Sequence, residues 1–156
     1  MEAKKRTRAS AKAAGRSLEV DLVEALNLRG LEAVRLGLQG TNDKGDVAAA
    51  RVPDHVFEAK NCRTLALSAW WQETLRERAN ANARYGWMIH KRHGVGDPSE
   101  QWATTTTGQL ADLLLELATL REAVAQLPPP VTLGNDGSAS LDIVVGSGQE
   151  QAQTTQ

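Results

Sequence analysis

The sequence predicts an α/β domain in which a mixed central β-sheet is flanked by helices in three layers. Apolar residues recur at the spacing of an amphipathic helix in residues 17–28 and 67–83. Short apolar runs typical of strands lie at residues 33–36, 56–60 and 85–90. With the remaining segments, the order is helix, strand, strand, strand, helix, strand, strand, helix. That order is typical of a sheet covered by helices.

The first helix is predicted over residues 17–28, with Ser17 as the N-cap. A turn of about 100° per residue places Leu22, Leu26 and Glu19 on one face. A glutamate on the inward face is either a functional side chain or a carboxylate that interacts with the helix dipole. Glu19 is therefore a candidate site residue, with the dipole interaction as the alternative.

A β-hairpin is predicted between residues 46 and 60. Residues 51–54, Arg-Val-Pro-Asp, indicate the turn, because proline fixes φ and aspartate is favoured in turns. A hairpin centred near residue 52 places Asp46 opposite Glu58. Side chains alternate along a strand, so Glu58 and Lys60 point to the same side. We therefore expect two carboxylates and an ammonium group to lie together.

These three side chains suit a divalent cation beside a phosphodiester. Two facing carboxylates repel unless a cation or a proton compensates them. Magnesium prefers oxygen ligands and binds through one or two carboxylates plus substrate phosphate, which indicates Asp46 and Glu58 as ligands. Lys60 is then placed to steady the attacking water. The alternative is a surface ion pair, but the neighbours Val56 and Phe57 predict a buried strand.

The second half of the chain continues the alternation of helices and strands. Residues 67–83 are predicted as a helix in which Trp71, Leu75 and Ala79 form one face, and residues 85–90 as a buried strand. A further strand is expected at residues 102–105.

The last predicted helix begins with a capping box formed by Thr106 and Gln109. Its apolar residues form one stripe that is either core or a dimer seam. The stripe comprises Leu110, Leu113, Leu114, Leu117, Leu120, Val124 and Leu127. Three prolines at 128–130 end the helix, and residues 129–156 are expected to be a partly disordered extension.

Composition predicts one domain, over residues 15–128, of a soluble protein. The chain of 156 residues is 41% hydrophobic and has no apolar run long enough to span a membrane. The single cysteine, Cys62, cannot form an internal disulfide, which favours a reducing cytoplasm.

Basic residues indicate a nucleic-acid partner. Residues 1–16 carry six basic side chains against one acidic, residues 17–94 eleven against ten, and residues 95–156 one against eight. A basic flexible arm over residues 1–14 and the cationic exit of the strand at 85–90 are expected to contact phosphate. The candidate contacts are Lys4, Lys5, Arg6, Arg8, Arg16, Lys44, His90, Lys91 and Arg92. The alternative for the arm is a solubilising tail.

Three motifs occur in a characteristic order: a helix with a glutamate at residues 15–19, a Gly-Asp strand start at residues 44–47, and Glu-Ala-Lys at residues 58–60. This arrangement resembles the PD-(D/E)xK nuclease superfamily, and within it the archaeal-type Holliday junction resolvases and their phage relatives. The resemblance covers residues 15–107. The proline of the superfamily's name is replaced here by Gly45.

The resemblance implies a restriction-endonuclease-like fold and a magnesium-dependent endodeoxyribonuclease, with Mn²⁺ as a substitute ion. Glu19, Asp46 and Glu58 would be the metal ligands and Lys60 the catalytic lysine. Gln72 corresponds to a glutamine found in some members, although Arg76 stands where those members have tyrosine.

The implied activity is phosphodiester hydrolysis by a homodimeric resolvase acting on branched DNA and leaving 5′-phosphate ends. Two alternatives stay open at this level. One is a restriction- or repair-type nuclease of the same superfamily, and the other is a catalytically silent DNA-binding module.

Overall fold

A computed structural model describes residues 7–37 and 40–128 of this chain. The elements are α1 (Arg8–Asn27), β1 (Ala33–Arg35), the 3-10 helix η1 (Gly40–Asn42), β2 (Val47–Ala49), β3 (His55–Lys60), α2 (Leu67–Ala81), β4 (Tyr85–His90), the 3-10 helix η2 (Pro98–Glu100), β5 (Trp102–Thr104) and α3 (Thr107–Ala125). The α/β class and the order of helices and strands predicted from the sequence are confirmed. The chain divides into two compact units between Leu114 and Leu115, so α3 begins in the first unit and continues into the second.

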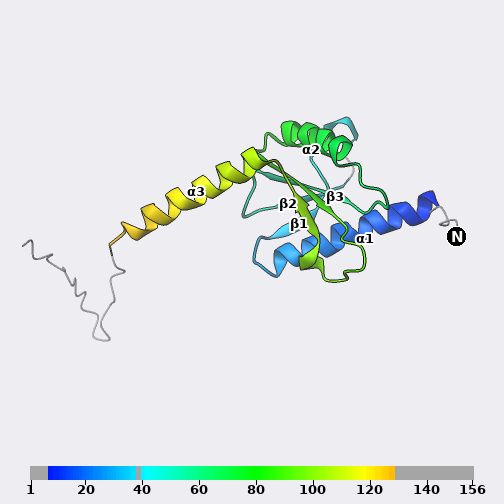
Figure 1. The fold of residues 1–156 in the computed structure, drawn as a ribbon, viewed down its shortest axis with the longest axis horizontal. Helices are drawn as coiled ribbons and strands as arrows, with labels where there is room; N and C mark the ends of the chain where they lie inside the picture. Colours follow the sequence, from blue (N-terminus) through cyan, green and yellow to red (C-terminus); the bar gives the residue numbers. More distant parts are fainter. Residues whose placement is uncertain (1–6, 38–39, 129–156) are drawn as a thin grey trace, which may run out of the picture. The chain divides into compact units, whose positions relative to one another are not determined.

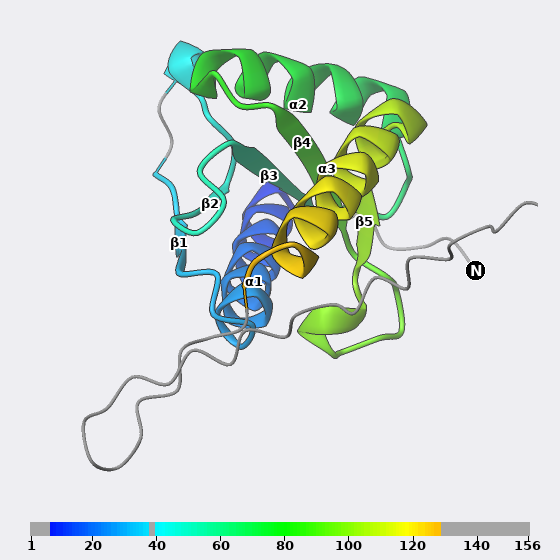
Figure 2. The ribbon, with the colours of Figure 1, turned by 90° about the vertical axis from the view of Figure 1, so that its left-hand side faces the viewer.

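Within the described residues, five strands form one mixed sheet in the order β1-β2-β3-β4-β5. β3 and β4 are parallel, and each other neighbouring pair is antiparallel. α2 connects the parallel pair, because parallel neighbours need a crossover rather than a tight turn. α1 and α2 lie on opposite faces of the sheet (Figures 1 and 2).

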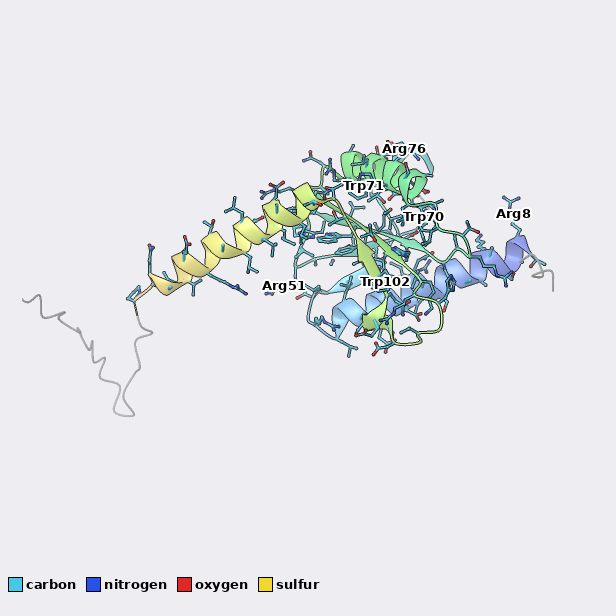
Figure 3. All side chains as sticks on the ribbon, viewed as in Figure 1. Arg8, Arg51, Trp70, Trp71, Arg76 and Trp102 are labelled. Atoms are coloured by element: carbon cyan, nitrogen blue, oxygen red, sulfur yellow. The ribbon has the colours of Figure 1, made fainter. Side chains whose placement is uncertain are left out.

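Strand alternation assigns the two faces. On one face, Leu22 of α1 packs in a buried cluster with Val47, Phe57 and Ile89. Neighbouring residues of β3 and β4 point to the other face, toward α2, where Trp70 is buried on the sheet side of the helix (Figure 3). The pairs Glu58–Met88 and Lys60–His90 are opposite each other in the parallel register. The charged residues of β3 therefore lie on the α2 face.

The first helix is longer than the sequence predicted. α1 begins at Arg8, and the hydroxyl of its N-cap Thr7 accepts a hydrogen bond from the Ser10 amide at 3.2 Å. Ser17 therefore lies inside the helix, and its assignment as the N-cap is wrong. The alanine-rich sequence before Ser17 has high helix propensity and extends the helix. Residues 8–14, which were expected in the basic arm, belong to α1.

The helix α3 does not bury its leucine stripe. Leu110 and Leu114 in the first unit are exposed, and so are Leu117, Leu120 and Val124 in the second. The core interpretation of these residues is therefore wrong, and the dimer seam stays a prediction. The capping box is half formed, because the Gln109 amide donates to the Thr106 hydroxyl at 3.3 Å while the Gln109 side chain turns elsewhere.

The side chain of Gln109 is buried and its carbonyl oxygen accepts from the Gly86 amide at 2.7 Å. The start of α3 is thereby bonded to β4. Across the part of the chain that the structure describes, no helix is both long and apolar enough to cross a membrane. The predicted extension, residues 129–156, lies outside the described residues.

Candidate active site

The β2–β3 hairpin places Asp46 beside Glu58, as predicted. Val47 is opposite Phe57 in the antiparallel register. Asp46, which precedes Val47, therefore lies beside Glu58, which follows Phe57. The Asp46 amide donates to the Phe57 carbonyl at 3.0 Å, and the Ala59 amide donates to Asp46 Oδ2 at 2.9 Å. The aspartate carboxylate is therefore held by the backbone of the strand that carries the glutamate.

Gly45 is required where it stands, directly before Asp46. Its φ is +92°, in the region that side chains other than glycine rarely adopt. A Cβ there would lie 2.8 Å from Val56 Cγ1 and 3.0 Å from the Phe57 carbonyl oxygen. The strand must approach β3 this closely for Asp46 to reach the Ala59 amide. The geometry explains why this position is occupied by glycine.

Four of the five predicted catalytic residues line one cavity of about 460 Å³. They are Glu19, Asp46, Glu58 and Lys60. Basic side chains also line the cavity, from the outer turns of α1 and from β1, namely Lys12, Arg16 and Arg35. An acidic floor with a basic rim suits a phosphate ester held beside a cation.

Among the carboxyl groups that line this cavity, Glu58 has the most strongly shifted pKa. Only 5% of the Glu58 residue is exposed to solvent. Burial raises the pKa of Glu58 from its ordinary value to about 9, and the negative charge of Asp46 adds to the rise. Burial also raises the pKa of Asp46. Protonation of Glu58 or a bound cation would relieve the repulsion between the two carboxylates.

Lys60 stands among carboxylates. Its ammonium donates to Glu58 and also to Glu73, the latter at 2.7 Å. Burial by itself lowers the pKa of Lys60, but the charges and hydrogen bonds of these two glutamates raise it above the ordinary value. Lys60 is therefore a charged ammonium group at physiological pH, directed into the site.

Glu19 lies in the cavity but is paired. Arg35 Nε and Nη2 donate to Glu19 Oε2 at 2.8 and 2.5 Å. The charge of Glu19 contributes to the raised pKa of Asp46, which places the two carboxylates within electrostatic reach. The predicted inward direction of Glu19 is confirmed, while its role as a metal ligand stays a prediction.

Gln72 is not brought to the site. It is exposed on α2 and is absent from the residues that line the cavity. The buried face of α2 consists instead of Trp70, Thr74 and Glu77. The buried face of α2 is therefore shifted by about one residue from the face that was predicted from Trp71, Leu75 and Ala79.

Glu73 and Glu77 are the site residues that sequence reasoning missed. Glu77 is 4% exposed, and its Oε2 has no hydrogen-bond partner within the described residues. Burial raises the pKa of Glu77 to about 7, and the charge of Glu73 contributes. A signal existed in the sequence, because Trp70, Thr74 and Glu77 follow the i, i+4, i+7 spacing of one helix face.

The predicted DNA contacts separate into two groups. Arg8, Arg16 and Lys44 are exposed, and Arg16 lines the cavity. Lys4, Lys5 and Arg6 lie outside the described residues.

At the exit of β4, His90 is 6% exposed, and its Nε2 is 2.9 Å from the Thr104 hydroxyl. A direct phosphate contact does not fit this buried ring, which corrects the expectation for His90. Arg92 donates to Glu100 at 3.2 Å and lies over the Trp102 ring. Lys91 is partly exposed.

The donor set fits a hard divalent cation. The half-buried Asp46 and the buried Glu58 are oxygen donors whose mutual repulsion a cation would relieve, and the unpartnered Oε2 of Glu77 shows excess acceptor capacity nearby. Oxygen donors of this kind favour Mg²⁺, Mn²⁺ or Ca²⁺ over softer metals. Comparison of the chain with protein-family models, curated proteins and solved structures found no match.

Proposed function

We propose that this protein is a metal-dependent DNA endonuclease of the PD-(D/E)xK type, with a restriction-endonuclease-like fold. One observation carries the proposal. Glu19, Asp46, Glu58 and Lys60, predicted from separate motifs, line a single cavity with a basic rim. The four residues come from α1, from β3 and from the residue just before β2, and their convergence supports the proposal.

In the proposed reaction, Asp46 and Glu58 hold the divalent cation. When bound, the cation supplies Lewis-acid activation of the scissile phosphate and lowers the pKa of a bound water. The Lys60 ammonium orients the attacking water and stabilises the negative charge that develops on the phosphorane oxygens. Water adds to phosphorus and the bond to the 3′ oxygen breaks, leaving a 5′-phosphate and a 3′-hydroxyl.

The basic rim supports a nucleic-acid substrate. Lys12 and Arg16 are exposed on α1 and line the cavity, where they would bind the phosphates on either side of the scissile bond. Branched DNA as the substrate and a homodimer as the active form follow from the resemblance to resolvases. We propose both on that ground.

Cleavage of a labelled four-way junction, beside a linear duplex of the same sequence, tests the proposal. We expect paired nicks on the junction with Mg²⁺, and none with EDTA or with Glu58→Ala. Equal cutting of both substrates would indicate a restriction- or repair-type nuclease. Binding of the junction without cleavage of either substrate would contradict the enzyme and support a silent DNA-binding module.

A further inference from the structure

Two glutamates of α2 converge on Glu58. Glu73 and Glu77 are four residues apart, so they lie on the same side of the helix. One carboxylate oxygen each from Glu58, Glu73 and Glu77 lies within 4.8 Å of the others. Divalent cations bind oxygen ligands at roughly 2.0–2.6 Å. Three oxygens at this separation are therefore close enough to share one ion.

Glu77 supplies an independent indication of a missing ligand. Its side chain is buried, and its Oε2 has no hydrogen-bond partner within residues 7–37 and 40–128. Buried polar atoms in folded proteins are almost always bonded, because an unsatisfied carboxylate oxygen away from water is strongly unfavourable. Glu77 is itself one of the three residues whose carboxyl groups converge, so a cation bound among them would lie within reach of its side chain.

The charge of the cluster points the same way. The Lys60 ammonium contacts Glu58 and Glu73, so one positive charge stands among three carboxylates. A neighbouring cavity of about 510 Å³ is lined by Asp43, Glu73 and Glu77, with Arg76 as its basic side chain. This cavity gives an ion access to the cluster from solvent.

We propose that Glu58, Glu73 and Glu77 form a second divalent-cation site, which shares Glu58 with the position that Asp46 helps to form. The inference rests on the proposed function, because Glu58 would be a ligand both at the position formed with Asp46 and at the second site. The ion is a hard one, Mg²⁺ or Mn²⁺, because the donors are carboxylates. It competes with the Lys60 ammonium for Glu58 and Glu73, so occupancy leaves Lys60 available to the substrate cavity.

Titration of the full chain with Mn²⁺, without DNA, measures the number of bound ions by electron paramagnetic resonance of the free ion. We expect two sites in the wild type. Glu77→Gln should retain one, with the affinity of the other lowered at least roughly tenfold. Glu24→Gln, an exposed glutamate of α1, is the matched control and should bind two.

Two further variants separate the positions. Asp46→Asn should abolish the site that Asp46 forms with Glu58 and keep the site that depends on Glu77. Glu73→Gln, whose side chain is 41% exposed, should weaken the same site as Glu77→Gln without disturbing a buried group. Unchanged stoichiometry and affinity in both Glu73→Gln and Glu77→Gln would overturn the second site.

Nuclease assays on the same samples distinguish the two proposals. Mn²⁺ binding that depends on Glu77 in a protein that cuts no DNA would contradict the proposed function and leave the second site intact. Cleavage by the wild type, with one Mn²⁺ that Asp46→Asn removes and Glu77→Gln does not, would leave the function intact and overturn the second site.

Discussion

The parallel strands β3 and β4 end side by side, and each ends in charged or titratable residues. Lys60 is opposite His90 in the register. At the end of β3, one ammonium group stands among the carboxyl groups of Asp46 and Glu58 and those that α2 adds. At the end of β4, Arg92 pairs with a carboxylate of its own loop.

The difference lies in how charge is compensated. Burial lowers the pKa of His90, so its ring is neutral, and its Nε2 is bonded to Thr104. The His93 ring lies 3.1 Å from the Cys62 carbonyl oxygen. His90 Nδ1 has no hydrogen-bond partner within the described residues, but the buried ring is uncharged, whereas the β3 end gathers several acidic side chains around one ammonium group. Polar residues at a strand end do not by themselves indicate a site, whereas buried carboxyl groups with raised pKa values make the β3 end the stronger candidate.

The largest expected contrast comes from the same substitution at the two strand ends. Lys60→Met removes the ammonium that we propose stabilises the transition state and should lower the cleavage rate roughly 10²- to 10³-fold. Lys91→Met should lower it less than about tenfold, because it removes at most one phosphate contact. Single-turnover kinetics on a labelled substrate measure both rates. Equal losses would contradict the assignment of chemistry to the β3 end.

Two glycines with positive φ provide the next contrast. Gly45→Ala should destabilise the protein by roughly 2–4 kcal/mol, because φ of +92° and the 2.8 Å approach to Val56 Cγ1 both oppose a Cβ. Gly94→Ala, at φ +83° with no atom within 4 Å of its Cβ, should lose only about 1–2 kcal/mol. Urea unfolding measures both, and a larger loss at Gly94 would refute this account of the hairpin.

The two strand ends should also respond to pH with opposite sign. The folded-state pKa values of Glu58 and Glu77 are raised to about 9 and about 7 from ordinary values near 4.5. Stability without metal should therefore fall as pH rises from about 5 to 9, since ionisation is disfavoured in the fold. The lowered pKa of His90 should instead remove stability as pH falls below 6.5.

Thermal unfolding in EDTA, scanned over pH, tests this sign. Glu77→Gln should flatten the alkaline loss, and His90→Asn should flatten the acidic one. A melting temperature that rises between pH 5 and 9 in EDTA would show that the glutamates are compensated by something other than a proton.

The smallest effect is expected for the surface ion pair at the β4 end. The Arg92 and Glu100 side chains are 40% and 59% exposed. Arg92→Gln should change the free energy of unfolding by about 1 kcal/mol or less, because exposed pairs are screened by water and salt. Chemical denaturation at low and high salt checks this, and a loss above 2 kcal/mol would show a structural role.

Local signals predicted most of the fold and the part of the candidate site that the β2–β3 hairpin forms. Residues 51–54 fix the hairpin turn, and the turn fixes the register that joins Asp46 to Glu58. Strand alternation then places Lys60 with Glu58. These relations depend on residues near each other in sequence, so the sequence alone contains them.

The missing part depends on how distant elements pack. Glu77 reaches Glu58 only because α2 docks with Trp70 and Thr74 inward, and the apolar spacing from Trp71 pointed to a neighbouring face. The burial of His90 depends on Thr104 of the edge strand β5 and on Trp70. The pairing of Glu19 likewise depends on Arg35 of β1. Such partners are not visible in local periodicity.

The most direct test of the central claim is the rate of DNA cleavage by wild type and by Glu58→Gln, each with Mg²⁺ and with EDTA. Glu58→Gln preserves the shape of the side chain and removes the charge that both proposed cation positions require. We expect Mg²⁺-dependent cleavage by the wild type and none above background in Glu58→Gln. Cleavage that persists in Glu58→Gln, or in EDTA, would contradict a metal-dependent site at the end of β3.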